Sequence, residues 1–171
     1  MLKIRKEEKG DESQIRIVNE LAFGQIDEAD LVDLLRINCN ESISLVAEFD
    51  NKIVGHILFT PALIEAKDKQ LNGMGLAPMA VLPEHQSKGI GSELVKSGLE
   101  LIMKGSCQFI IVLGHPKYYP RFGFVKASEC NIKSDFHGIP DEAFMILVLD
   151  EKSFAGISGT AKYRKEFSSA V

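Results

Sequence analysis

One stretch near the middle of the chain constrains the fold more than any other, because it changes from strand to turn to helix within a few residues. An apolar run over residues 79–82 ends at Pro83, which has no N–H for a strand hydrogen bond. The segment Gln86-Ser-Lys-Gly-Ile-Gly91 follows, with glycines where the backbone must turn tightly or approach a ligand. From Ile90 onward apolar residues recur at helical spacing, so the sequence predicts a buried strand, a turn and a helix start.

The turn from Gln86 to Gly91 has features of a phosphate-binding site. A glycine-containing turn that opens a helix leaves N–H groups unpaired at the positive end of the helix dipole. The P-loop pattern is excluded because no Gly-Lys-Ser/Thr closes the loop, and the dinucleotide fingerprint has Leu94 where a third glycine is needed. The pattern Gln86-x-x-Gly89-x-Gly91 remains, with an ordinary strand-to-helix turn as the alternative.

Length and composition indicate one ordinary domain. The chain has 171 residues, 45% of them hydrophobic and 26% charged. Its net charge is −4 and it lacks a Lys/Arg run, which argues against nucleic acid or an anionic membrane as a partner. Lys3, Arg5 and Lys6 place charge where a signal peptide needs apolar residues, and no apolar run is long enough for a membrane span. We expect a soluble, cytoplasmic protein.

The cysteines argue against a disulfide framework and against a metal site. There are three, Cys39, Cys107 and Cys130, and none forms a Cys-x-x-Cys pair. Reduced thiols are therefore expected. Cys107 begins an apolar strand, which favours core packing over a role as nucleophile.

The pattern along the chain predicts an α/β order. Residues 2–6 alternate as a strand, and Asp11-x-x-Gln14 is typical of a capping box at the start of a helix. A second helix is expected near 28–37. Strands follow over 42–49 and 52–63, joined by a tight turn at 50–52, and another begins near Leu71.

The second half of the chain predicts a βαβ unit. A helix over 88–104 precedes the apolar strand Phe109–Leu113, so this strand should run parallel to the one before the helix. Short strands are expected at 124–126 and 143–149, with a polar loop between them. Residues 153–171 lose apolar content, which predicts a mobile or loosely packed tail. We expect a domain over 1–150 and a tail over 151–171.

A second motif, Tyr119-Pro-Arg-Phe-Gly-Phe124, follows the buried strand. Together with the first motif, it resembles the GNAT superfamily of acyl-CoA-dependent N-acetyltransferases. The runs Gly75-Leu-Ala-Pro-Met-Ala-Val-Leu-Pro83 and Gly114-His-Pro-Lys-Tyr-Tyr119 resemble its YhbS-like bacterial branch. Many members carry an asparagine after the fifth strand, where this chain has Gly114-His115-Pro116. The contacts to the pantetheine arm and thiol of CoA should therefore differ in detail from those of such members.

The resemblance implies a fold and a cofactor. The fold is a single GNAT-like α/β domain with a mixed sheet of six or seven strands, antiparallel at its N-terminal side, a central βαβ unit and helices on both faces. The cofactor is acetyl-CoA, the acyl donor. Its pyrophosphate would lie on backbone N–H groups from Gln86 to Gly91, and its pantetheine arm along the backbone of Met79 and Val81. The residues implied in cofactor binding are Met79, Ala80, Val81, Gln86, Ser87, Lys88, Gly89, Ile90, Gly91 and Ser92.

Within this set, the Ser87 and Ser92 hydroxyls would add donors, and the Ala80 N–H would polarise the thioester carbonyl. Lys88 would contribute its charge, or else is a solvated surface lysine. Tyr119 matches the acid that protonates the leaving thiolate, with a packing tyrosine as its alternative. The general base is not identifiable: the candidates Glu48, His56, His85 and His115 stay open.

The function that follows from the resemblance is acetyl transfer from acetyl-CoA to a primary amine of an unidentified small molecule or protein. The rival is a non-catalytic acyl-CoA-binding sensor or regulatory module. A nucleotide-binding oxidoreductase domain is disfavoured by the incomplete fingerprint. The acceptor and the oligomeric state stay open, a homodimer included.

Overall fold

The computed structural model describes residues 1–169, which contain three α-helices and nine strands. They form two compact units. The first comprises residues 1–59, 77–101 and the chain from 165 onward, and the second comprises residues 60–76 and 102–164. Strands β3 (Lys52–Ala66) and β4 (Gln70–Val81) each contribute residues to both units.

The first unit contains an antiparallel arrangement at the start of the chain. Strand β1 (Leu2–Lys6) pairs with β2 (Ile43–Phe49), and β2 pairs with the first part of β3. The turn between β2 and β3 has positive φ at Asp50 and Asn51, as a tight hairpin requires. The helices are α1 (Glu12–Phe23), α2 (Asp27–Asn38) and α3 (Ile90–Met103), with short 3-10 helices η1 (Pro83–His85) and η6 (Lys165–Ser169).

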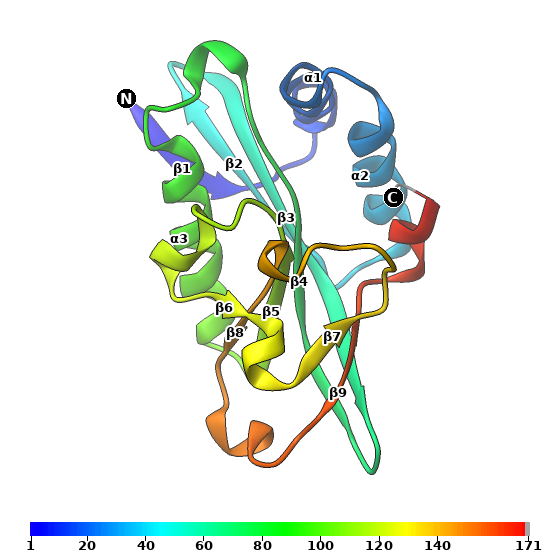
Figure 1. Ribbon diagram of the computed structural model, residues 1–171. Helices are drawn as coiled ribbons and strands as arrows, with labels where there is room; N and C mark the ends of the chain where they lie inside the picture. Colours follow the sequence, from blue (N-terminus) through cyan, green and yellow to red (C-terminus); the bar gives the residue numbers. More distant parts are fainter. Residues whose placement is uncertain (170–171) are drawn as a thin grey trace. The chain divides into compact units, whose positions relative to one another are not determined.

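Helices cover both faces of these strands (Figure 1). A Cβ on Gly55 of β3 would lie 3.0 Å from Leu94 and 3.2 Å from Ile90, both on α3. The next residue, His56, contacts Asn19 of α1. Because successive residues of a strand point to opposite faces, α3 lies on one face and α1 on the other. This confirms the expectation of helices on both faces.

The predicted capping box at the start of α1 is wrong. Asp11 is the N-cap residue, but its side chain makes no capping bond. Its carboxylate instead accepts hydrogen bonds from the Arg5 guanidinium at 2.7 Å and from the Glu8 N–H at 2.7 Å. Gln14 likewise turns away and accepts from the Ile53 N–H of β3 at 3.1 Å. Arg5, Glu8 and Ile53, which lie outside the capping pattern, take the acceptor groups that the pattern would use.

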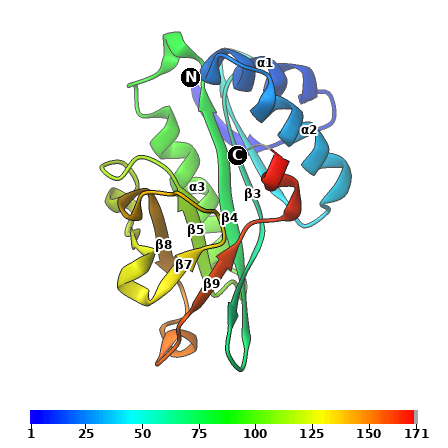
Figure 2. The ribbon, with the colours of Figure 1, turned by 45° about the vertical axis from the view of Figure 1, so that its right-hand side comes forward.

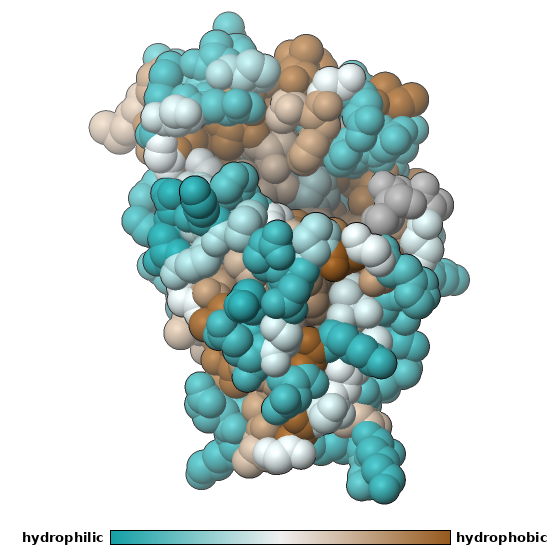
Figure 3. All heavy atoms as spheres, viewed as in Figure 1, coloured by the Kyte–Doolittle hydropathy of each residue, from teal (hydrophilic) through white to brown (hydrophobic). Residues whose placement is uncertain are grey.

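Apolar side chains remain exposed on α1, α2 and the loop between them, and Figure 3 shows part of this hydrophobic surface near α1. The residues are Ile17, Leu21, Phe23, Ile26, Leu34 and Ile37. Both helices therefore carry apolar residues on buried and exposed sides, which blurs the helical period in their sequence.

The second unit contains the parallel pair. Residues 74–76 of β4 run parallel to β5 (Phe109–Leu113), which confirms the predicted βαβ unit. Strand β8 (Phe144–Val148) pairs antiparallel with β5 and with β6 (Val125–Lys126). Four of the five β5 residues are buried, because side chains pack on both faces of this strand.

Two strands lie where the sequence predicted a polar loop and a tail. Strand β7 (Ile132–Ser134) runs parallel to β9 (Gly159–Lys162), as Figure 2 shows, and β9 pairs antiparallel with residues 63–66 of β3. The described residues thus hold nine strands rather than six or seven. Strands β7 and β9 are too short to show an alternating pattern in the sequence. Backbone pairing with strands distant in the chain stabilises them. The boundary at residue 150 stays a prediction, and the last two residues of the expected tail lie outside the described part.

Some residues after 150 are packed inside the protein. Ile157, Ala161 and Phe167 are buried. The remaining short 3-10 helices are η2 (Tyr119–Phe122), η3 (Ala127–Cys130), η4 (Asp141–Ala143) and η5 (Glu151–Phe154). All three cysteines are unpaired. In the described part of the chain, no helix combines the length and apolar character needed to cross a membrane.

Candidate functional site

The loop between β4 and α3 is tied to the end of its strand by side chains. Strand β4 ends at Val81, and α3 begins at Ile90, two residues later than predicted. The Gln86 side-chain amide donates to the Val81 carbonyl at 2.9 Å. The Lys88 ammonium donates to the Glu84 carbonyl at 2.8 Å. These two bonds hold residues 86–88 in a fixed path before the helix.

Gly89 has the conformation that makes a glycine necessary here. Its φ is +84°, in the left-handed region, and a Cβ would meet no atom within 4 Å. Its carbonyl accepts the Glu93 N–H at 3.1 Å, so the hydrogen bonding of α3 begins at Gly89. The N–H groups of Ile90 and Gly91 precede this first bond, at the positive end of the helix. Open space and N–H groups together fit a bound phosphate.

The predicted cofactor residues fall into two sets within the first unit. Ser87, Lys88 and Gly89 are exposed in the loop, whereas Gly91 and Ser92 lie half-buried in the first turn of α3. In β4, Ala80 and Val81 bury their side chains, and Met79 does so in part. Ala80 and Val81 are thus buried as whole residues, and the Val81 carbonyl already accepts a hydrogen bond from Gln86. Their contacts with acetyl-CoA stay a prediction.

Tyr119 lies in the second unit, at the start of η2. Its ring packs against Phe124, with centroids 5.8 Å apart, and its side chain is only 7% exposed. The ring occupies the space that a side chain at Gly114 would need, since a Cβ there would lie 2.4 Å from a ring carbon. Gly114 is thus required by the packing of Tyr119.

The hydroxyl of Tyr119 keeps its proton. Burial raises its pKa, and the neighbouring Tyr118 raises it further. Within residues 1–169 this hydroxyl makes no hydrogen bond to the protein. The adjacent Tyr118 differs: its ring lies edge-on to Tyr119 and beneath the guanidinium of Arg121, 4.5 Å from it. Tyr119 therefore provides a protonated donor with no protein acceptor, as an acid requires.

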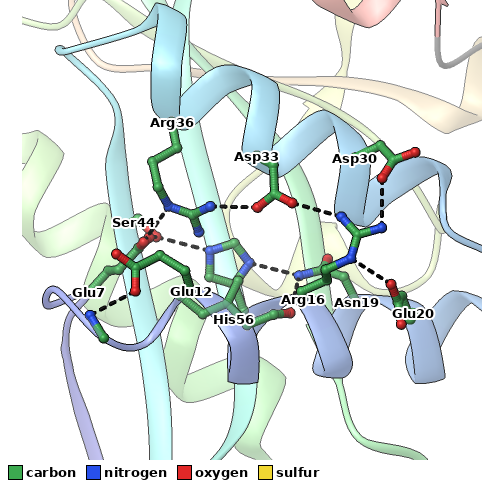
Figure 4. A network of polar contacts seen from close by, with 12 residues as sticks. Glu7, Glu12, Arg16, Asn19, Glu20, Asp30, Asp33, Arg36, Ser44 and His56 are labelled. Carbon is green, nitrogen blue, oxygen red and sulfur yellow. Dashed lines mark hydrogen bonds and ion pairs between the residues drawn. The ribbon is translucent and has the colours of Figure 1, made fainter.

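His56 is fully buried in a chain of hydrogen bonds (Figure 4). Asn19 donates to its Nδ1 at 3.2 Å, and its Nε2 lies 2.9 Å from the Ser44 hydroxyl. Ser44 donates to Glu7, so the Nε2–H of His56 must donate to Ser44. Burial, and then the charge of Arg36, lower the pKa of His56 to about 3. Both ring nitrogens are occupied and the ring is neutral, which argues against His56 as the base.

The other candidate bases also have partners. Glu48 accepts a hydrogen bond from Arg5 at 2.8 Å, and the two form an ion pair. The His85 ring packs against Phe49, with centroids 5.7 Å apart. The His115 Nδ1 accepts the Lys117 N–H at 3.2 Å. Of the four candidates, only His56 has both ring nitrogens in hydrogen bonds, and Glu48 is held in an ion pair.

The sequence missed two features near these sites. One is the buried series Asn19–His56–Ser44–Glu7, which joins residues that no local pattern connects. The other is Tyr163, which follows β9 and whose hydroxyl donates to the Leu76 carbonyl at 3.2 Å. The alternation of Ala161 and Tyr163 with polar neighbours was a signal for it.

Comparison with known proteins agrees with this arrangement. Residues 40–126 match the acetyltransferase (GNAT) domain. The N-acetyltransferase YjhQ of Escherichia coli is 45% identical over 120 residues, which cover 68% of this chain and 66%, slightly under two thirds, of YjhQ.

Two solved structures share the fold over nearly the whole chain. The GNAT family N-acetyltransferase YhbS of Escherichia coli, in complex with CoA, has a TM-score of 0.87 at 28% identity, covering 98% of this chain and 92% of YhbS. A GNAT family acetyltransferase of Brucella melitensis, in complex with acetyl-CoA, has a TM-score of 0.77 at 32% identity, covering 98% of both chains. The chain belongs to the GNAT family of acetyltransferases.

Proposed function

We propose that this protein transfers an acetyl group from acetyl-CoA to a primary amine of a small molecule or protein. The observation that carries the proposal is the loop before α3, where Gly89 at φ +84° opens space beside the helix N-terminus. A diphosphate fits such a site because N–H groups and the helix dipole both favour negative charge. The complexes of YhbS with CoA and of the Brucella melitensis enzyme with acetyl-CoA support this assignment.

Acetyl-CoA contacts two segments in this proposal, the loop before α3 and the end of β4. In our proposal, the N–H groups from Gln86 to Gly91 bind the pyrophosphate, and the Ser87 and Ser92 hydroxyls add donors. Lys88 supplies charge from the same loop, where its ammonium is already held on the Glu84 carbonyl. The backbone of Met79 and Val81 binds the pantetheine arm, and the Ala80 N–H polarises the thioester carbonyl.

The reaction is a direct attack on the thioester. The amine nitrogen bonds to the carbonyl carbon, the C–S bond breaks, and the sulfur leaves as a thiolate. The attacking nitrogen loses one proton, and the thiolate gains one. The products are an N-acetylated amine and free CoA.

Tyr119 is assigned as the acid that protonates the thiolate. Its hydroxyl stays protonated and makes no hydrogen bond within the described protein. Such a phenol breaks no hydrogen bond to the protein when it gives its proton to the thiolate. Packing against Gly114 and Phe124 fixes the ring, so the donor keeps its direction.

No protein base is assigned. His56 has both nitrogens occupied, and Glu48 is paired with Arg5. We propose that water accepts the amine proton, with His85 and His115 as the remaining protein candidates. The amine must be neutral before it attacks, so turnover should rise with pH until the amine itself is deprotonated.

Binding tests the assignment first. Acetyl-CoA, CoA and NAD are titrated separately in a thermal-shift assay, and acetyl-CoA and CoA should raise the melting temperature by mass action. A response to NAD without one to CoA would overturn the proposal.

A panel of primary amines, each incubated with acetyl-CoA, then separates catalysis from the rival role as a non-catalytic acyl-CoA-binding module. Release of free CoA is expected of an enzyme, and binding without release is expected of a sensor or regulatory module.

A further inference from the structure

A pocket of about 290 Å³ lies within the second unit, where η3 and β7 meet the loop after β7 and the start of β8. Its wall contains apolar side chains: Ile132 and Phe144 are buried, and Phe136 and Ile139 are half-buried. The exposed Ser128 stands at its rim. This volume is near the lower end of the range for ligand sites, so the pocket suits a small molecule.

The charged side chains of this pocket favour no ionic ligand. Asp141 forms an ion pair with Lys126 at 3.7 Å, and both side chains reach solvent. Lys133 and His137 are exposed as well. Exposed charges contribute little binding energy, because water and salt screen them. Selectivity therefore rests on the apolar wall, where removing apolar surface from water is favourable.

Phe136 offers the pocket a ring whose position is fixed from behind. This ring stacks on that of Tyr163, with centroids 6.1 Å apart and planes 26° apart. Tyr163 is itself held, because its hydroxyl donates to the Leu76 carbonyl at 3.2 Å. A Cβ on Gly75 would lie 2.5 Å from a carbon of the Tyr163 ring, so this ring fills the space beside β4. One face of Phe136 is thus covered, and the uncovered part of its ring lines the pocket.

The pocket lies one strand away from the surface on which Tyr119 packs. Phe144 pairs with Leu113 of β5, and the residue before it, Ala143, accepts the Gly114 N–H at 2.9 Å. A Cβ on Gly114 would lie 2.4 Å from the Tyr119 ring. Neighbouring strands are about 5 Å apart, so the backbone between the pocket and the acid is about one strand spacing wide.

The pocket and the acid lie on opposite faces of β5. Phe144 belongs to the apolar cluster that contains Ile132, and Leu113 packs against it, so both point toward the pocket side. Successive residues of a strand point to opposite faces, and Gly114 accordingly points toward Tyr119. Direct attack needs the amine and the acid at different positions around the thioester, because one bonds to the carbon and the other protonates the sulfur.

We propose that this pocket is the acceptor subsite, and that it selects a primary amine carried on an aryl or branched alkyl body. The proposal rests on the function proposed above, in which an amine is acetylated and Tyr119 is the acid. The body of the acceptor packs on Phe136 and Ile132, and its amine extends past the end of β5 toward Tyr119. Small polar amines gain little in this pocket, because they bury little apolar surface.

Binding of phenethylamine, an aryl primary amine, tests the pocket without acetyl-CoA. In amide NMR spectra, millimolar phenethylamine should shift signals of residues 128–144. Phe136→Ala should abolish these shifts, whereas Phe23→Ala, which removes a partly exposed phenyl ring from α1, should keep them. Ser128→Trp adds an indole at the exposed rim and removes no core contact, and should weaken the shifts as well. No shift in this segment, or shifts that survive in both pocket variants, would overturn the site.

Steady-state kinetics tests the acceptor role. kcat/KM should be at least about tenfold higher for phenethylamine than for ethanolamine, a small polar primary amine. Phe136→Ala should lower kcat/KM for phenethylamine about tenfold more than that for ethanolamine, mainly through KM, and Phe23→Ala should change neither. A preference for ethanolamine, equal losses for both amines or no loss would overturn the acceptor role. Acetylation of no amine at all would instead refute the proposed function, while the NMR titration would still decide whether the pocket binds an aryl amine.

Discussion

The ring of Phe59 on β3 occupies the space beside Gly98 on α3: a Cβ at Gly98 would lie 2.2 Å from a ring carbon. Both residues belong to the first unit, and both are buried. The close approach of α3 to its strand thus depends on a glycine within the helix, although glycine is otherwise unfavourable there.

We predict that Gly98→Ala destabilises the protein by about 1–3 kcal/mol, because the added methyl forces the Phe59 ring out of place. The free energy of unfolding in urea measures this. Gly105→Ala is the matched control, since a Cβ there would be 3.6 Å from its nearest neighbour, and should change stability by less than about 0.5 kcal/mol. Equal effects of the two changes would contradict this packing.

The neutral, buried His56 should make stability depend on pH. Its pKa is lowered to about 3, while an unfolded histidine titrates near its ordinary value of 6.5. Between these values the unfolded chain binds the extra proton, so the full stability is present above about pH 6.5 and is lost as the pH falls toward 3. The slope should approach about 1.4 kcal/mol per pH unit.

Urea unfolding between pH 7 and pH 5 measures that slope before carboxylates begin to protonate. His56→Gln serves as the comparison. The variant should be less stable at pH 7, because Ser44 and Asn19 lose partners of the right geometry. Its stability should nevertheless fall less steeply with acidification than that of the wild type. Parallel slopes would show that His56 does not stay neutral.

Gly89→Glu should abolish binding of acetyl-CoA and leave the fold largely intact. The side chain has room, since nothing lies within 4 Å of its Cβ, but it would block the phosphate and repel it. Calorimetric titration and circular dichroism measure the two effects. Gly24→Glu controls for backbone strain, because Gly24 also has positive φ, at 70°, and open space. Normal affinity in Gly89→Glu would place the phosphates elsewhere.

Tyr119→Phe should lower turnover by roughly 10²–10⁴-fold, toward the smaller end, because thiolate is already a fair leaving group. Affinity for acetyl-CoA should hardly change. Tyr118→Phe should have much less effect, because the Tyr118 ring packs against Arg121 rather than Gly114. Steady-state kinetics with an acceptor, or hydrolysis of acetyl-CoA in its absence, measures this. Wild-type turnover in both variants, with chemistry rate-limiting, would make Tyr119 a packing residue.

The local sequence determined the elements that show a period or a strong turn signal. The alternation in β1, the apolar run of β5 and the helical spacing of α3 each appear at nearly the predicted bounds. The Gln86-x-x-Gly89-x-Gly91 turn was predictable for the same reason. Its conformation follows from residues within one turn of each other, and Gly89 takes the positive φ that its residue type permits.

Only the tertiary structure decided features that depend on partners distant in sequence. Gln14 fits a capping box locally, yet its side chain accepts from the Ile53 N–H, 39 residues away. His56 looked like a candidate base, but burial and its bonds to Asn19 and Ser44 make it neutral and occupied. Tyr163 lay in an expected tail, and the position of its hydroxyl follows from strands 50 and more residues away. Burial and long-range hydrogen bonds set these properties, and neither is encoded in the local pattern of residues.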